Sequence, residues 1–204
     1  MQTIFRTPMN LTAKTLENAW LRLEPLEERH REGLRAACAA DPDIWAELYP
    51  YSMVGPHFDL VWDKRFKIDR ARGAAIQFAV MAEDRCVGIT TFGAISPENA
   101  SANLGGTYYH PDFRGGVVNP AAKRLMLGHA FDCGARRVEL TVDALNQRSR
   151  AAVLKLGAVQ EGILRQDRVV WTGRVRDTVV FSVLKDEWPA VRDRLDARLA
   201  AFAA

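Results

Sequence analysis

Residues 110–131, with the sequence HPDFRGGVVNPAAKRLMLGHAF, place an arginine and two glycines directly before a stretch with helical periodicity. Asn119 is a residue type that favours helix N-caps and Pro120 suits the first turn, so we expect a helix to begin at Asn119. Neither residue explains the Arg-Gly-Gly that precedes them. Backbone amides gathered before a helix N-terminus can bind an anion, with help from the helix dipole. The stretch therefore predicts a site for a pyrophosphate group, with an ordinary glycine turn as the alternative.

The segments on either side of this stretch predict a mixture of strands and helices. Alternation of apolar residues predicts strands at 19–26, 75–82, 86–95, 102–110, 136–144, 158–171 and 174–184. Helical spacing predicts helices at 27–40, 58–69, 119–131, 147–157 and 187–202. We expect Gly157 to cap the fourth helix and Phe202 to lie on the apolar stripe of the last one. The order of these elements is typical of a mixed α+β sheet.

The composition, with 48% apolar and 26% charged residues, is that of one compact domain over residues 1–204 with a polar N-terminal arm at 1–18. No run is long and apolar enough for a membrane-spanning helix, and the first residues lack the apolar stretch of a secretion signal. We therefore expect a cytoplasmic protein. The three cysteines, Cys38, Cys86 and Cys133, follow no metal-ligand spacing, so we expect reduced thiols and no metal site.

The charge of the chain argues against a nucleic-acid partner. Its net value is +3, although ten Lys and Arg stand against five Asp and Glu between Arg114 and Arg168. These basic residues alternate along amphipathic segments, so they do not form one stripe of the kind that tracks a phosphate backbone. The positive charge is nevertheless concentrated around the stretch that predicts an anion site.

Three blocks of the sequence resemble the GNAT N-acetyltransferase superfamily. Residues 114–119 are similar to its Arg-x-x-Gly-x-Gly/Ala motif, although Val117 and Asn119 stand where glycine or alanine is usual. Residues 136–165 and 173–195 resemble the branch that contains the RimJ/RimL-type N-terminal acetyltransferases. In that branch an asparagine at the place of Asn119 is familiar. The resemblance covers residues 20–196. It implies a twisted, mostly antiparallel sheet of about seven strands, with helices on both faces and a splay between the fourth and fifth strands.

The resemblance also implies that acetyl-CoA is the co-substrate and that its pantetheine arm enters the splay as an added strand. We expect a glycine bulge at Gly105-Gly106 beside this arm. The cofactor-binding residues that it implies are Tyr108, Tyr109, His110, Arg114, Gly115, Gly116, Val117, Val118, Asn119, Lys123 and Asn146. Asn146 is also a natural N-cap for the helix that follows it.

The catalytic residues are less clearly defined by the sequence. The resemblance implies that Ser149 protonates the leaving thiolate, and a capping hydroxyl is its alternative role. Relatives often carry a glutamate as general base where this chain has Asn103, which cannot accept a proton. We name Asp167 as the candidate base, although neighbouring strand residues face opposite ways and its carboxylate then points to the wrong side. The alternatives are Glu98, His110 or Asp112, a water relay, or an amine that needs no base.

The acceptor is expected to be a primary amine, either a peptide or protein N-terminus or a small molecule. Large residues with a polar tip suit such a pocket, and core packing is their other explanation. We name Trp45, Tyr49, Phe92 and Trp171, with Tyr51 beside them. The chain is expected to be a monomer or a homodimer. An alternative function is a CoA-binding sensor that has lost turnover.

Overall fold

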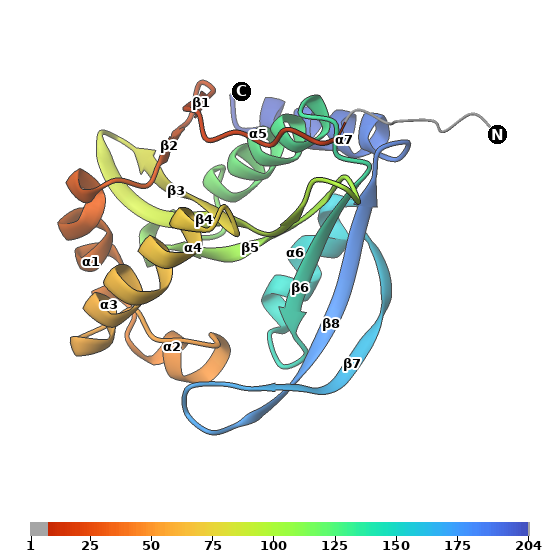
Figure 1. Cartoon of the computed structure of the whole chain (residues 1–204). Coiled ribbons are helices and arrows are strands. Elements are labelled where there is room, and N and C mark those ends of the chain that lie inside the picture. Colours follow the sequence, from red (N-terminus) through yellow and green to blue (C-terminus); the bar gives the residue numbers. More distant parts are fainter. Residues whose placement is uncertain (1–7, 204) are drawn as a thin grey trace.

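The computed structural model of the chain describes residues 8–203 and shows one open sheet with helices on both of its faces (Figure 1). The strand order is β1-β2-β3-β4-β5-β6-β8-β7, and every neighbouring pair except β5 and β6 is antiparallel. The strands are β1 Leu16–Glu17, β2 Arg22–Pro25, β3 Ala75–Ala82, β4 Arg85–Ser96, β5 Ser101–Tyr109, β6 Arg137–Asp143, β7 Val159–Val169 and β8 Val175–Leu184. The predicted mixed α+β fold is confirmed.

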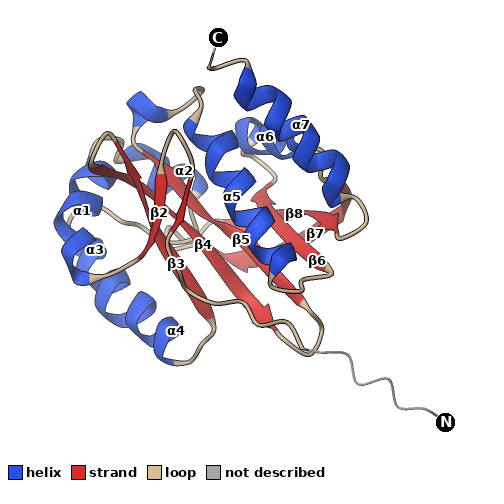
Figure 2. Cartoon of the chain, turned by 90° about the horizontal axis from the view of Figure 1, so that it is seen from above, coloured by secondary structure: helices blue, strands red, loops and turns tan. Residues whose placement is uncertain are grey.

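The helices divide between the two faces of the sheet, with α1, α3 and α4 on one side and α5 and α7 on the other (Figure 2). The helices are α1 Arg31–Ala39, α2 Asp43–Leu48, α3 Pro56–Leu60, α4 Lys67–Ala71, α5 Val118–Asp132, α6 Gln147–Leu156 and α7 Trp188–Ala200. A π-helical segment, Val61–Phe66, joins α3 to α4, so the predicted helix at 58–69 is present but is not regular.

Each face of the sheet carries its own apolar core because successive strand residues point to opposite sides. On β5, Ala102 and Leu104 pack with Met126 of α5 in the core below α5 and α7. On the other face, Trp45 and Trp62 pack among the helices that precede β3. Full burial of such side chains stabilises the fold by about 1.5–3 kcal/mol each. The core below α5 and α7 includes residues of β3–β5 as well as β6 and β8, so it holds the two halves of the sheet together, whereas the other core lies on the half that ends at β5.

The separation occurs between β5 and β6, as the family resemblance implied. These parallel strands pair only over Ser101–Asn103 and Arg137–Glu139. Beyond Asn103 the remaining residues of β5 pair with β4 alone, and the remaining residues of β6 pair with β8 alone. The splay therefore leaves two strand edges that face each other without hydrogen bonds between them.

A bulge in β5 lies beside the splay. Thr90 of β4 stands opposite two residues, Gly106 and Thr107, because the register shifts between the pairs Ile89 with Tyr108 and Thr91 with Gly105. Gly106 has a φ of 54°, which favours glycine. The predicted glycine bulge is thus confirmed, and it bends β5 where the sheet opens.

Several boundaries differ from the predicted ones. Helix α5 begins at Val118, not at Asn119, so Asn119 lies within the first turn and does not cap the helix. Phe202 lies beyond the end of α7 and is exposed. Part of the predicted arm, Leu16–Glu17, forms the short strand β1 and makes the sheet eight-stranded, whereas residues 1–7 lie outside the described part. None of the helices described is long and apolar enough to cross a membrane.

Candidate active site

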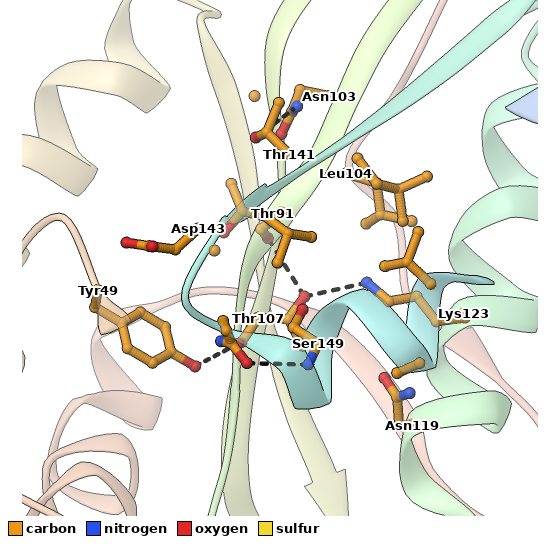
Figure 3. Close-up of a pocket in the computed structure, with 18 of the residues that line it drawn as sticks. Tyr49, Thr91, Asn103, Leu104, Thr107, Asn119, Lys123, Thr141, Asp143 and Ser149 are labelled. Atoms are coloured by element: carbon orange, nitrogen blue, oxygen red, sulfur yellow. Dashed lines mark hydrogen bonds between the residues drawn. The ribbon is translucent and has the colours of Figure 1, made fainter. Parts of the chain in front are cut away.

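A cavity of about 620 Å³ occupies the splay and is lined from both faces of the sheet (Figure 3). On the α5 face, the lining includes residues 114–116 and side chains of α5, α6 and α7. On the other face, it includes residues 48–51, side chains of the π-helical segment and α4, and the hairpin of β7 and β8. Two ligands can therefore approach the gap between β5 and β6 from opposite sides of the sheet.

The loop before α5 presents backbone amides to this cavity. Within the described residues, no N–H group of residues 115–119 donates a hydrogen bond to a protein acceptor. Gly115 has a φ of 78°, which turns the chain so that these amides gather. Val117 keeps the negative φ, −73°, that a β-branched residue requires, and its side chain packs on the core instead of lining the cavity. The loop is thus suited to an anion despite the valine.

Arg114 holds this loop against the rest of the molecule. Its Nε donates to the carbonyl of Tyr109 at 2.8 Å, its Nη1 bonds Asp41, and its guanidinium lies 5.1 Å from the ring centre of Tyr108. Its buried Nη2 has no hydrogen-bond partner among the described residues. Arg114 therefore positions the loop, and one of its donors is left for a ligand of the cavity.

Lys123 is a cation without a carboxylate partner. It lies on the second turn of α5, and its Nζ donates to the hydroxyl of Thr107 at 3.2 Å (Figure 3). No salt bridge to Lys123 occurs in the described chain. Burial lowers the pKa of Lys123 to about 8, because desolvation disfavours the charged form. An anion bound in the cavity would supply the missing counter-charge.

The first turn of α6 lies on the opposite strand edge of the splay. The Asn146 Oδ1 accepts a hydrogen bond from the Ser149 amide at 2.9 Å, so Asn146 caps α6 as predicted. Its Nδ2 has no acceptor among the described residues, and both side chains line the cavity. The cap thus leaves one donor of Asn146 and the Ser149 hydroxyl directed at the ligand space.

Residues 21–159 match the family described as "Acetyltransferase (GNAT) domain". The chain belongs to the GNAT acetyltransferase family. The structure also superposes on a GCN5-related N-acetyltransferase from Brucella melitensis with a TM-score of 0.84 and 31% identity, over 96% of this chain and 90% of that one.

Two similarities lie within the expected GNAT branch. Over 95 residues the chain is 28% identical to the "Ribosomal-protein-serine acetyltransferase" of Escherichia coli K12. That match covers 47% of the chain and 53% of the relative, so the chain spans about half of that relative's length. Mycobacterium smegmatis RimJ in complex with CoA-disulfide shares the fold, with a TM-score of 0.79 and 22% identity over 91% of this chain and 95% of that one. The predicted resemblance to the RimJ/RimL-type branch is confirmed at modest identity.

In this GNAT domain, three polar side chains near the β5 bulge have no hydrogen-bond partner among the described residues. They are Gln77, Thr91 and Tyr51. Gln77 is 2% exposed, and its Oε1 is buried and unpaired. A Cβ atom placed on Gly106 would lie 3.3 Å from the Thr91 hydroxyl and 3.4 Å from the Tyr51 hydroxyl, so both converge on the bulge. Buried polar groups in proteins are normally satisfied, so these three are available to a ligand or to water.

The Asp167 side chain lies on the face of the sheet opposite α5, beside Thr178, whereas simple alternation along β7 placed it on the other face. Residues 165–167 of β7 stand opposite the single residue Asp177, and this three-against-one bulge changes the side to which Asp167 points. Its carboxylate accepts from the hydroxyl of Thr178 at 2.8 Å, which lowers its pKa, and from Arg168. Asp167 does not line the cavity. It is therefore a poor candidate for a base that takes a proton directly.

The structure brings together only part of the predicted site. The predicted residues that line the cavity are Tyr49, Tyr51, Tyr109, Arg114, Gly115, Gly116, Asn119, Lys123, Asn146 and Ser149. The predicted residues outside its lining are Trp45, Phe92, Tyr108, His110, Val117, Val118, Asp167 and Trp171. Phe92 and Trp45, which were named for the acceptor pocket, are fully buried, one in each core. Core packing therefore explains both residues. Trp171 donates to the Trp45 carbonyl at 2.8 Å and fixes the hairpin tip beside α2.

Sequence reasoning missed several residues that line the cavity. The missed residues are Gln77, Asp143, Arg148, Arg176 and Arg198. Gln77 carried a signal, since it is an amide on the face of β3 that holds small residues, Ala75 and Ala79. Asp143 ends β6, four residues beyond the last residue of β6 that pairs with β5. Within residues 8–203, no group of three His, Cys, Asp or Glu side chains is placed to hold a metal ion.

Proposed function

We propose that the chain is an acetyl-CoA-dependent N-acetyltransferase that moves an acetyl group to a primary amine in a ternary complex. The observation that carries this proposal is the two-sided cavity at the splay, with unpaired amides on one face and unpaired polar side chains on the other. This arrangement lets a thioester and an amine meet between β5 and β6. Holding two reactants in this way is a large part of catalysis by such enzymes.

The residues on the α5 face fit a pyrophosphate. Among residues 8–203, the amides of residues 115–119 lack protein acceptors, the Arg114 Nη2 is buried and unpaired, and Lys123 has no carboxylate partner. These groups would hold the diphosphate of acetyl-CoA, and the strand edges of β5 and β6 would pair with its pantetheine arm. Acetyl-CoA supplies a thioester whose carbonyl carbon an amine can attack.

The acceptor amine must lose a proton before or during attack, and no single residue beside the bulge is suited to accept it. Burial raises the pKa of the Tyr51 hydroxyl, so Tyr51 stays protonated at neutral pH. Gln77 and Thr91 are not bases. We therefore favour a water relay held by these three groups, and we assign Ser149 to protonate the leaving thiolate.

The acceptor itself is proposed from the relatives. The name of the Escherichia coli relative assigns it a ribosomal-protein serine, which makes a protein or peptide N-terminus the first acceptor class to test and a small amine the second. A CoA-binding sensor without turnover is the alternative, because Asn103 replaces the usual glutamate and its amide is held by Thr141 at 3.2 Å. The cytoplasm stays the proposed location.

The test is to incubate the protein with acetyl-CoA and a panel of peptides and small amines while following release of free thiol. Thiol release that depends on an acceptor supports the proposal. Binding of CoA, measured by calorimetry, without acceptor-dependent release across the panel would replace the enzyme with the sensor. Absence of CoA binding would reject both functions.

A further inference from the structure

Arg176 of β8 is an almost buried cation that lines the acceptor side of the cavity. Its residue exposure is 5%. Its Nε donates to the Thr178 hydroxyl at 3.0 Å, and that hydroxyl donates in turn to Asp167 at 2.8 Å. Among the described residues, no protein acceptor takes a hydrogen bond from its two Nη groups. The side chain is thus fixed at one nitrogen, with the end of its guanidinium left for a ligand.

The charges around Arg176 do not balance. The cluster contains three arginines, Arg168, Arg174 and Arg176, and two carboxylates, Asp143 and Asp167. Arg168 pairs with Asp167 at 2.6 Å, and Arg174 pairs with Asp143 at 2.5 Å, whereas Arg176 lies 3.8 Å from Asp143. One positive charge is left over, and Arg176 has the weakest pairing. Burial lowers the pKa of Arg176, as expected for a cation without a full counter-charge.

The excess charge lies on the face that the acceptor would use. Arg176 and Thr178 are two residues apart on β8 and share one face of the sheet, whereas Val179 and Phe181 face the core below α5. The loop that fits pyrophosphate is on the α5 face. Across the cavity, Arg65 lies 3.8 Å from Asp69, so that pair adds no net charge. Arg176 is therefore the cation in surplus on the acceptor side.

We infer that the amine acceptor carries a carboxylate near its amine and that Arg176 binds this carboxylate. This inference rests on the proposed function and names the substrate class of the same site. A guanidinium matches a carboxylate with two parallel hydrogen bonds, and burial makes such a pair stronger than it is in water. For a peptide acceptor, the carboxylate is an Asp or Glu side chain close to the N-terminus. A phosphate shares part of this chemistry and is separated from a carboxylate by the test.

The test compares three peptides that differ at the second residue, which is glutamate, glutamine or phosphoserine. We expect kcat/KM for the glutamate peptide to exceed that for the glutamine peptide by about tenfold to one-hundredfold, the effect of a hydrogen-bonded charge. Equal values overturn the inference. A clear preference for phosphoserine over glutamate overturns the carboxylate assignment. If neither these peptides nor any other amine is acetylated, the proposed function itself is wrong. If an acceptor is acetylated without a preference for glutamate, only this inference is wrong.

A variant then tests the residue. Arg176→Gln should lower kcat/KM for the glutamate peptide by about tenfold to one-hundredfold, so that the ratio of kcat/KM between the glutamate and glutamine peptides falls to about one. The matched control is Arg192→Gln, which removes an exposed arginine of α7 that, in the described part of the chain, pairs only with its neighbour Asp193. Calorimetric CoA binding checks that each variant is folded. A preference for glutamate that persists in a folded Arg176→Gln protein overturns the role of Arg176, and the wild-type comparison remains decisive if the variant does not fold.

Discussion

The N-termini of α5 and α6 both face the cavity, but their amides are satisfied in different ways. At α6, the Asn146 side chain accepts from the Ser149 amide at 2.9 Å. At α5, the amides of residues 115–119 find no acceptor within the described chain. Both helices direct the positive end of their dipole toward the cavity, but α5 keeps more free amides than α6 and is therefore the better site for an anion. The difference separates two tasks: α5 should set the affinity for CoA, and α6 should set the turnover.

The largest expected effect lies at α6. Ser149→Ala should lower kcat by about one-hundredfold, the contribution expected of a general acid, with an unchanged dissociation constant for CoA. Steady-state kinetics and calorimetry measure the two quantities. The matched control is Gln147→Ala, an exposed position in the same turn. A kcat equal to that of the wild type would show that Ser149 is only a hydroxyl of the capping region. A loss of CoA affinity with an unchanged kcat would contradict the assignment of CoA binding to α5 and of turnover to α6.

The next effect lies at α5, where Lys123→Met should weaken CoA binding by about tenfold or more through loss of a charge near the diphosphate. The same change should stabilise the ligand-free protein by roughly 1–3 kcal/mol at pH 7, because an unpaired buried ammonium is replaced by an apolar chain.

The pH dependence of that stabilisation follows from the lowered pKa. Lys123 titrates near 8 in the folded chain against an ordinary value of 10.5, so the folded state binds fewer protons between these limits. The cost of its charge is fully present below pH 8 and fades as the pH rises to 10.5. The gain in melting temperature of Lys123→Met should fade over the same window. Lys155→Met, at an exposed position of α6, should show no such pH dependence, and a flat difference for Lys123→Met would show that Lys123 is not the buried cation.

The sequence could predict those features of the cavity that depend on local backbone conformation and on helix capping. The glycine pairs at 105–106 and 115–116 marked the β5 bulge and the loop before α5, because Gly106 and Gly115 have φ values of 54° and 78° that other residues rarely adopt. Asn146 marked the start of α6 through its side-chain oxygen. Each of these signals depends on a few neighbouring residues, so it can be recognised in the sequence without knowledge of the fold.

The parts that sequence could not predict depend on register. Asp167 reaches the acceptor face only because three residues of β7 oppose Asp177, and a bulge of that width has no marker in the chain. Arg176 is separated from Asp143 by more than thirty positions, so their shared charge is visible only after β6 pairs with β8. Phe92 was assigned to the wrong face for the same reason, since alternation sets relative sides but does not say which side faces the pocket.

A smaller effect tests the geometry of the α5 entrance. Gly115→Ala places a Cβ on a residue with a φ of 78°, which costs about 1–2 kcal/mol, although no atom lies within 4 Å of that Cβ. The strain should turn the amides away from the anion and raise the CoA dissociation constant about fivefold. Gly116→Ala is the matched control, because its Cβ also meets open space and its φ is not positive. Equal affinities in both variants would mean that the loop does not need the left-handed turn.

The smallest effect separates the two roles of Asn146. Asn146→Ala removes the cap and should lower the free energy of unfolding by about 1 kcal/mol. Asn146→Asp keeps an oxygen for the Ser149 amide but replaces Nδ2, the donor that faces the cavity, by a second acceptor. If Nδ2 donates to a substrate, Asn146→Asp should lower kcat/KM and keep the melting temperature. If Asn146 only caps the helix, Asn146→Asp should match the wild type in both kcat/KM and melting temperature. In that second case the α6 entrance contributes only Ser149 to the reaction, and its contrast with α5 becomes sharper still.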